Sequence, residues 1–206
     1  MTFQAIHIIL LVTVLVSIRG FKDSNLRDRF LFVPYRVKHS NQWEGLFGHM
    51  LLHADFTHLL FNMLSLYFLG SILEQEMVMA YGFVKGEIQF LIIYLIGGLF
   101  STLIPFIRHQ NNPHYRSLGA SGAVSAVIFA TILWRPDIEL MLFFIPIPIP
   151  AYVFGPLYLA FEYWADKRGE SGIAHDAHIG GALFGIFYVL ILNIDKGKEF
   201  LDYLIA

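Results

Sequence analysis

Stretches without Asp, Glu, Lys or Arg recur along the chain, and each is about as long as a membrane-spanning helix. A helix that crosses the hydrocarbon core of a bilayer needs about 20 mostly apolar residues. The stretches predict six spans at about 2–18, 50–73, 88–107, 118–134, 151–165 and 177–194. Pro146, Pro148 and Pro150 exclude a continuous helix before the fifth span, so we expect an extended apolar loop there. The pattern predicts an all-α polytopic membrane protein, a six-helix bundle forming one domain over 1–206.

The composition agrees with a membrane protein. Hydrophobic residues make up 56% of the chain and charged residues only 15%, against about 25% charged residues in a typical soluble domain. The 14 Lys and Arg residues are outnumbered by 16 Asp and Glu residues, for a net charge of -2. This balance argues against a nucleic-acid partner. The chain has no cysteine, which excludes disulfides, thiolate metal sites and a cysteine nucleophile.

Polar side chains gather at the beginnings of three of the predicted spans. They are His49, His53, His58 and Asn62 at the second, Ser121 within Gly119-Ala120-Ser121-Gly122 at the fourth, and His175, Asp176 and His178 at the sixth. Polar groups at membrane depth are costly and mark either functional sites or internally satisfied contacts. Alternate spans of a polytopic bundle run in the same direction. The three clusters are therefore expected to meet at one face of the membrane.

A serine between glycines, a histidine from another helix and donors from a third helix are the parts needed for nucleophilic acyl transfer. Ser121 is the expected nucleophile, and His178 the general base that takes its proton. The Ser121 backbone N–H, at a helix N-terminus, would stabilise the oxyanion together with side-chain donors from His58 and Asn62. Gly119 and Gly122 would allow the substrate backbone to approach.

These residues resemble the motifs of the rhomboid family of intramembrane serine proteases. The family pattern HxxxxHxxxN is matched by His53, His58 and Asn62, and the pattern GxSG by residues 119–122. The pattern AHxxGxxxG is matched by Ala177, His178, Gly181 and Gly185. Each motif alone is weak, but the three occur in the expected order on alternate predicted spans.

The resemblance implies an endopeptidase that cuts transmembrane or membrane-proximal substrates within the lipid bilayer and needs no cofactor and no metal. It implies a catalytic dyad of Ser121 and His178 without an acidic third member. The residues expected to form the oxyanion hole or position the substrate are His58, Asn62, Gly119, Ala120 and Gly122, and those with a structural role beside the site are His53 and Gly181. Many members have an aromatic residue four positions after the serine, stacked on the histidine. Ser125 occupies that position here, so something else must orient His178.

The resemblance also implies a location in the cell inner membrane, with the active site on the extracytoplasmic side. The distribution of positive charge points the other way. The connections on the expected catalytic face contain ten basic residues, namely Arg19, Lys22, Arg27, Arg29, Arg36, Lys38, Arg108, Arg116, Lys167 and Arg168. Only Lys85, Arg135, Lys196 and Lys198 lie on the opposite face. By the positive-inside rule, the catalytic face would be cytoplasmic.

Other interpretations compete with a protease. Ser121 could be a small packing residue, and His175 could replace His178 as the base. The two alternatives to catalysis are a non-catalytic relative that binds membrane clients, and a metal-handling protein that uses His49, His53, His58, His175 and His178. The presence of both Ser121 and His178 argues against the first. A metal-handling protein would need carboxylates inside the membrane spans, and we expect none there. Asp176 is expected to be a helix N-cap rather than a catalytic acid.

Overall fold

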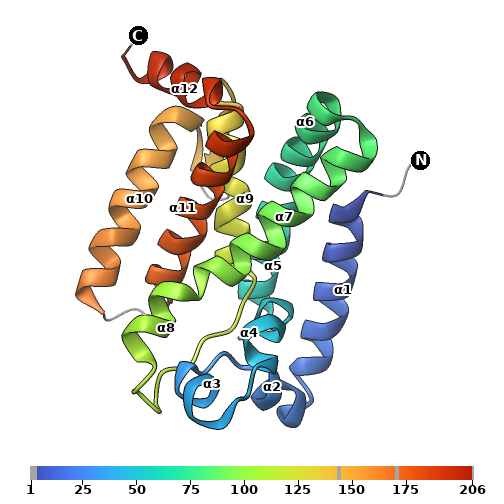
Figure 1. The fold of residues 1–206 in the computed structure, drawn as a ribbon, viewed down its shortest axis with the longest axis vertical. Coiled ribbons are helices and arrows are strands. Elements are labelled where there is room, and N and C mark those ends of the chain that lie inside the picture. The colour runs from blue at the N-terminus through green and yellow to red at the C-terminus, as the bar shows by residue number, and fades with distance from the viewer. Residues whose placement is uncertain (1–3, 143–144, 170–171, 206) are drawn as a thin grey trace.

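The structure is a computed structural model that describes residues 4–142, 145–169 and 172–205. It is mainly a bundle of upright helices, with the short helices of the first connection gathered at one end (Figure 1). The longer helices are α1 (Ala5–Gly20), α5 (Phe56–Ser65), α6 (Ser71–Tyr81), α7 (Phe83–Ser101), α9 (Ser121–Trp134), α10 (Ala151–Arg168) and α11 (His175–Leu192). A single π-helical turn, η2 (Leu66–Gly70), joins α5 to α6 without a break.

Among the described residues, three continuous helices are long and apolar enough to cross a membrane. They are Phe56–Tyr81, Phe83–His109 and His175–Leu192, and the apolar helices Ala5–Gly20 and Ser121–Trp134 are shorter. The structure therefore has the helical membrane architecture that the hydropathy pattern predicts. The helix Phe56–Tyr81 begins later and ends later than the predicted span 50–73. Asp55 caps its start, and the carboxylate Glu74 is buried inside the bundle rather than ending the helix.

Helix α9 is the centre of the bundle. Every residue from Gly122 to Trp134 is buried except Ile128. A helix that is apolar on all sides is expected to be surrounded by other helices, and α9 packs against α7 and α11. The outer helices expose large apolar side chains such as Leu15, Phe68 and Phe187. These exposed side chains suit contact with lipid, and the central position of α9 places its first residue, Ser121, inside the protein.

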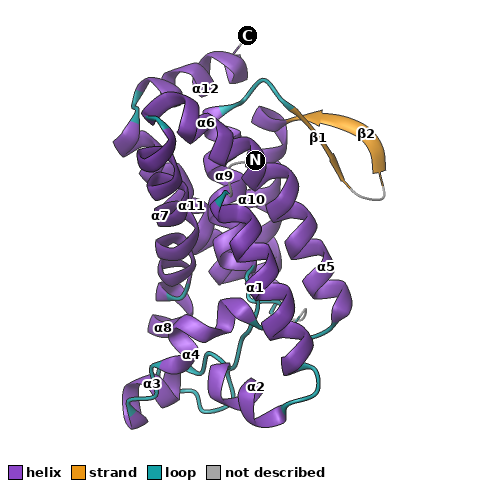
Figure 2. Ribbon diagram, turned by 90° about the vertical axis from the view of Figure 1, so that its right-hand side faces the viewer, coloured by secondary structure: helices purple, strands orange, loops and turns teal. Residues whose placement is uncertain are grey.

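A β-hairpin and a C-terminal helix lie outside the six predicted spans. Strands β1 (Glu139–Leu142) and β2 (Ile145–Pro150) form an antiparallel hairpin that projects from the side of the bundle (Figure 2). Alternating prolines prevent a helix in β2, so the expected extended loop is present as a strand. The C-terminal helix α12 (Asp195–Ile205) was not predicted, because its charged residues exclude it from a search for uncharged stretches.

The connection between α1 and α5 folds into short helices at the end of the bundle where the polar clusters lie. They are α2 (Ser24–Phe30), α3 (Pro34–Ser40), α4 (Glu44–Gly48) and the 3-10 turn η1 (His49–Leu51). The Asp23 carboxylate caps α2 by accepting a 3.0 Å hydrogen bond from the Leu26 N–H, and Pro34 begins α3. The short helix α8 (Leu103–His109) continues α7 toward the same end.

Candidate active site

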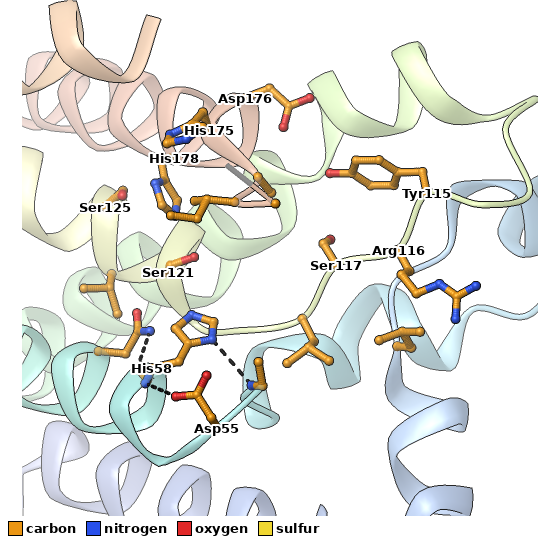
Figure 3. Close-up of a pocket in the computed structure, with 18 of the residues that line it drawn as sticks. Asp55, His58, Tyr115, Arg116, Ser117, Ser121, Ser125, His175, Asp176 and His178 are labelled. Carbon is orange, nitrogen blue, oxygen red and sulfur yellow. Dashed lines mark hydrogen bonds between the residues drawn. The ribbon is translucent and has the colours of Figure 1, made fainter. Parts of the chain in front are cut away.

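Residues from all three polar clusters line one cavity of about 1410 Å³ at the end of the bundle where the first connection lies, but His49 and His53 do not line it. Ser121 and His178 lie next to one another, and His58 lies on the other side of Ser121 (Figure 3). Asn62 also lines this cavity. The beginnings of the second, fourth and sixth predicted spans therefore lie at one end of the bundle, as the parity of the spans predicts.

The backbone leading into Ser121 is held by hydrogen bonds to distant segments. Ser117 and Phe32 exchange two backbone hydrogen bonds of 3.0 Å. The Gly119 N–H donates to the His49 carbonyl oxygen at 2.9 Å, and the Ala120 N–H donates to His53 Nε2 at 3.3 Å. Helix α9 then begins at Ser121, where the N–H groups of the first turn have no partner within the helix. These bonds fix the position of Ser121 before any substrate binds.

His53 joins this segment to α1. Because Nε2 accepts from Ala120, the ring proton is on Nδ1, which donates to Ser17 Oγ at 2.9 Å. The Ser17 hydroxyl in turn donates to the Leu51 carbonyl oxygen at 2.8 Å. His53 is 2% exposed, and burial lowers its pKa to about 3. The neutral ring therefore links Ser17 of α1 to Ala120, the residue before the nucleophile, through one donated and one accepted hydrogen bond.

The buried neutral state of His53 predicts a loss of stability in acid. The folded-state pKa is lower than the unfolded value, so unfolding takes up a proton as the pH falls from about 6.5 toward about 3. We expect the melting temperature in detergent to fall between pH 7.5 and pH 5, and to fall less in His53→Asn. Thermal unfolding at the two pH values measures this. An equal acid-induced drop in both proteins would mean that His53 titrates normally in the fold.

His58 lies against the glycine that precedes the Ala120–Ser121 pair. Asp55 Oδ1 accepts a 2.8 Å hydrogen bond from the His58 N–H and so caps α5. Gly119 has a φ of +130°, and a Cβ there would lie only 2.9 Å from His58 Nε2. Only glycine suits this position, for reasons of both conformation and space. The Asn62 amide donates to the His58 carbonyl oxygen at 2.9 Å and retains a second N–H donor.

Close packing of α9 against α11 brings His178 to Ser121. A Cβ at Gly181 would lie 2.0 Å from the Gly122 carbonyl oxygen, and one at Gly185 would lie 2.1 Å from the Ala126 carbonyl oxygen. The two helices therefore touch backbone to backbone, as small residues permit in membrane proteins. The Gly181/Gly185 spacing in the sequence corresponds to this contact.

Replacing Gly181 by Val is expected to separate α9 from α11 and to remove His178 from Ser121. The neighbouring atom is backbone and cannot rotate away, so we expect a loss of stability of about 3 kcal/mol, the upper end of the usual cost of overpacking. The melting temperature and the activity should fall together. Leu183→Val is the matched control, because Leu183 is on the exposed side of the same helix. A Gly181→Val protein that melts and reacts like the control would contradict the close packing.

Glu162 of α10 forms a hydrogen bond with His178. The sequence motifs did not identify this residue. Glu162 Oε1 lies 3.1 Å from His178 Nδ1, and Oε2 lies 2.6 Å from His175 Nδ1. Glu162 is 3% exposed. The expectation that the spans lack carboxylates was therefore wrong. The available signal was an acidic residue inside the predicted span 151–165.

Asp176 does not cap α11. The N-cap is Ala174, and Asp176 lies in the first helical turn. Its Oδ2 is 3.4 Å from Arg108 Nη1, and its Oδ1 accepts from the Ala177 N–H at 2.9 Å. The prediction of an N-cap was wrong because the helix begins one residue before Asp176.

Glu162, His175 and His178 are also the residues that could hold a metal ion in the described part of the chain, since their ligand atoms lie within 4.8 Å of one another. This set differs from the five histidines considered from the sequence. His49 Nδ1 instead contacts the Gly45 carbonyl oxygen at 3.0 Å, and both ring nitrogens of His53 have partners.

Comparison with known proteins identifies a matching family and several relatives. A family model described as "Rhomboid domain" matches residues 40–194. "RHOMBOID-like protein 12, mitochondrial" from Arabidopsis thaliana is 27% identical over 200 residues, which cover 90% of this chain and 56% of the relative. The human "Presenilin-associated rhomboid-like protein, mitochondrial" is 33% identical over 108 residues, 52% of this chain and 28% of the relative.

A bacterial relative is similar over a longer segment than the human protein. "Rhomboid protease GluP" from Bacillus subtilis (strain 168) is 28% identical over 159 residues, which cover 77% of this chain and 28% of the relative. The matched region thus spans little more than half of the Arabidopsis protein and under a third of the human and Bacillus proteins. The family model covers the bundle from α4 to α11.

Proposed function

The chain belongs to the rhomboid family, and we propose that it is an intramembrane serine endopeptidase that hydrolyses peptide bonds in or near transmembrane segments of membrane proteins. The observation that carries the proposal is the cavity in which Ser121 begins α9 between His178 of α11 and His58 of α5. A serine hydroxyl at a helix N-terminus and imidazoles from two other helices have no common structural purpose. Together they are the requirements of acyl transfer.

In the proposed reaction, Ser121 Oγ attacks the substrate carbonyl carbon while His178 Nε2 takes the hydroxyl proton. The oxyanion receives hydrogen bonds from the Ser121 N–H, from the second N–H of Asn62 and from His58. Gly119, Ala120 and Gly122 keep this region free of bulky side chains. The proton on His178 passes to the leaving amine, and water from the cavity then hydrolyses the acyl-enzyme by the same steps in reverse. These residue roles need neither a cofactor nor a metal.

The proposal includes the topology. We assign six spans to α1, α5–α6, α7, α9, α10 and α11, which form one membrane domain, with the cavity open to the extracytoplasmic side. The substrates are transmembrane proteins presented by the bilayer. The cell inner membrane and the orientation both stay predictions, because the relatives include mitochondrial as well as bacterial proteins and the positive-inside rule favours the opposite orientation.

Cleavage in proteoliposomes tests the proposal. The purified protein is reconstituted with a single-span substrate whose transmembrane segment contains a helix-breaking glycine pair, and the products are identified by mass spectrometry. We expect one cut in or next to the membrane segment, blocked by a fluorophosphonate. Binding of the substrate without any cut, by a folded protein, would instead favour a non-catalytic client-binding protein.

A further inference from the structure

Glu162 is an acidic side chain in the middle of an apolar helix, and its position needs a physical reason. Its neighbours on α10 include Phe161 and Trp164, which are exposed on the outside of the bundle, while Glu162 faces inward and is buried. Burial of a carboxylate is costly unless charged or hydrogen-bonding partners compensate for it. The partners here are the imidazoles of His175 and His178.

The hydrogen bonds fix the ring state of His178. An ionised carboxylate can only accept, so the 3.1 Å contact to Glu162 Oε1 requires a proton on His178 Nδ1. In the neutral ring, Nε2 is then the unprotonated nitrogen and can accept the Ser121 proton. The opposite tautomer would present an N–H to the serine and could not act as a base. Glu162 therefore selects the reactive tautomer.

Ser125 connects to the same carboxylate through Tyr158. The Tyr158 hydroxyl interacts with the side chains of both Glu162 and Ser125, and its ring packs against Phe129 of α9 at a centroid distance of 5.8 Å. Ser125 is the position at which many rhomboid proteins have an aromatic residue against the histidine. In this chain the position instead belongs to a polar network that ends at Glu162.

We propose that Glu162 is the positioning residue of His178, so that Ser121, His178 and Glu162 work as a serine-histidine-glutamate triad rather than as a dyad. The proposal rests on the proposed function of Ser121 and His178. When the Ser121 Oγ–carbon bond forms, the hydroxyl proton moves to His178 Nε2, and the ring becomes a cation. Glu162 remains ionised, and its negative charge stabilises this cation until the proton passes to the leaving amine.

The test compares Glu162→Gln with wild type in proteoliposomes. The amide keeps the size of the side chain but removes the charge and can donate to Nδ1, which favours the wrong tautomer. We expect kcat to fall by about 10²- to 10⁴-fold with KM about unchanged, and Glu162→Asp to recover part of the loss. Asp166→Asn is the matched control, an acid-to-amide change one turn further along α10 at a residue paired with Arg108. Its kcat should equal that of wild type.

A second variant separates positioning from a structural role. If Glu162 acts through His178, adding Glu162→Gln to His178→Ala causes no further loss in the residual rate. Multiplied losses in the double variant, or a fall in melting temperature that accounts for the lost activity, would overturn the proposal. So would wild-type kcat in Glu162→Gln. An inactive wild type would instead contradict the proposed function itself.

The metal content of the purified protein tests whether Glu162, His175 and His178 bind a metal ion instead. The triad predicts no stoichiometric metal and an activity that EDTA leaves unchanged. One zinc ion per chain, lost in Glu162→Gln, with activity that EDTA changes, would assign Glu162, His175 and His178 to a metal site and overturn the triad.

Discussion

Replacing Ser121 by Ala is expected to lower kcat for a transmembrane substrate by about 10⁵- to 10⁶-fold. The oxyanion-stabilising groups remain in the variant, but no atom is left to attack the carbonyl, and loss of the nucleophile of a serine protease has an effect of this size. The fold should not change, because the Ser121 side chain is not needed for the hydrogen bonds that hold residues 117–120. Single-turnover cleavage and thermal unfolding of the same preparation measure both quantities.

Ser117→Ala is the matched control for the nucleophile. Ser117 lines the same cavity and lies four residues before Ser121, but it is not at a helix N-terminus. The control should cleave within about 3-fold of wild type, since no interaction of Ser117 enters the chemical step. If Ser121→Ala retained activity while Ser117→Ala lost it, the nucleophile would be misassigned.

The second large effect is expected for His178→Ala, with a fall in kcat of about 10⁴- to 10⁶-fold. Without the imidazole, the serine proton has no acceptor within reach, and the leaving amine has no donor. The cavity should admit a small base, so added imidazole is expected to restore part of the activity. Cleavage rates with and without imidazole, at constant pH, check this result.

His175→Ala distinguishes the two histidines that share Glu162. His175 contacts the same carboxylate at 2.6 Å, but Ser121 lies beside His178 (Figure 3). We expect His175→Ala to retain far more activity than His178→Ala. The reverse order would make His175 the base and would require a different arrangement of α11 during the reaction.

The motif residues could be placed from the sequence because their spacing follows helix geometry. Parity of the predicted spans brought Ser121, His58 and His178 to one face, and the structure places them around one cavity. The contact between α9 and α11 was not predicted, although the Gly181/Gly185 spacing that permits it is visible in the sequence. The motifs did not contain Glu162. Its role depends on its contact with His178, which is 16 residues away in the sequence.

The ends of the helices were harder to predict, because charged residues inside the bundle have partners that a sequence does not show. Glu74 Oε1 accepts from the Ile6 N–H at 3.0 Å, and Glu87 Oε2 accepts from the Ala5 N–H at 2.9 Å. The two carboxylates thus satisfy the N-terminal N–H groups of α1. A search for uncharged stretches ended the second span before Glu74 and began the third after Glu87 for this reason.

The most direct test of the central claim is to map the residue that reacts with a fluorophosphonate probe. The purified protein is labelled in detergent, digested, and analysed by tandem mass spectrometry, beside His178→Ala. An activated serine reacts far faster than an ordinary hydroxyl, so we predict one adduct per chain, on Ser121, and almost none in the variant. An adduct on a different serine, or no adduct on a folded protein that also leaves a transmembrane substrate uncut, would contradict the proposed protease.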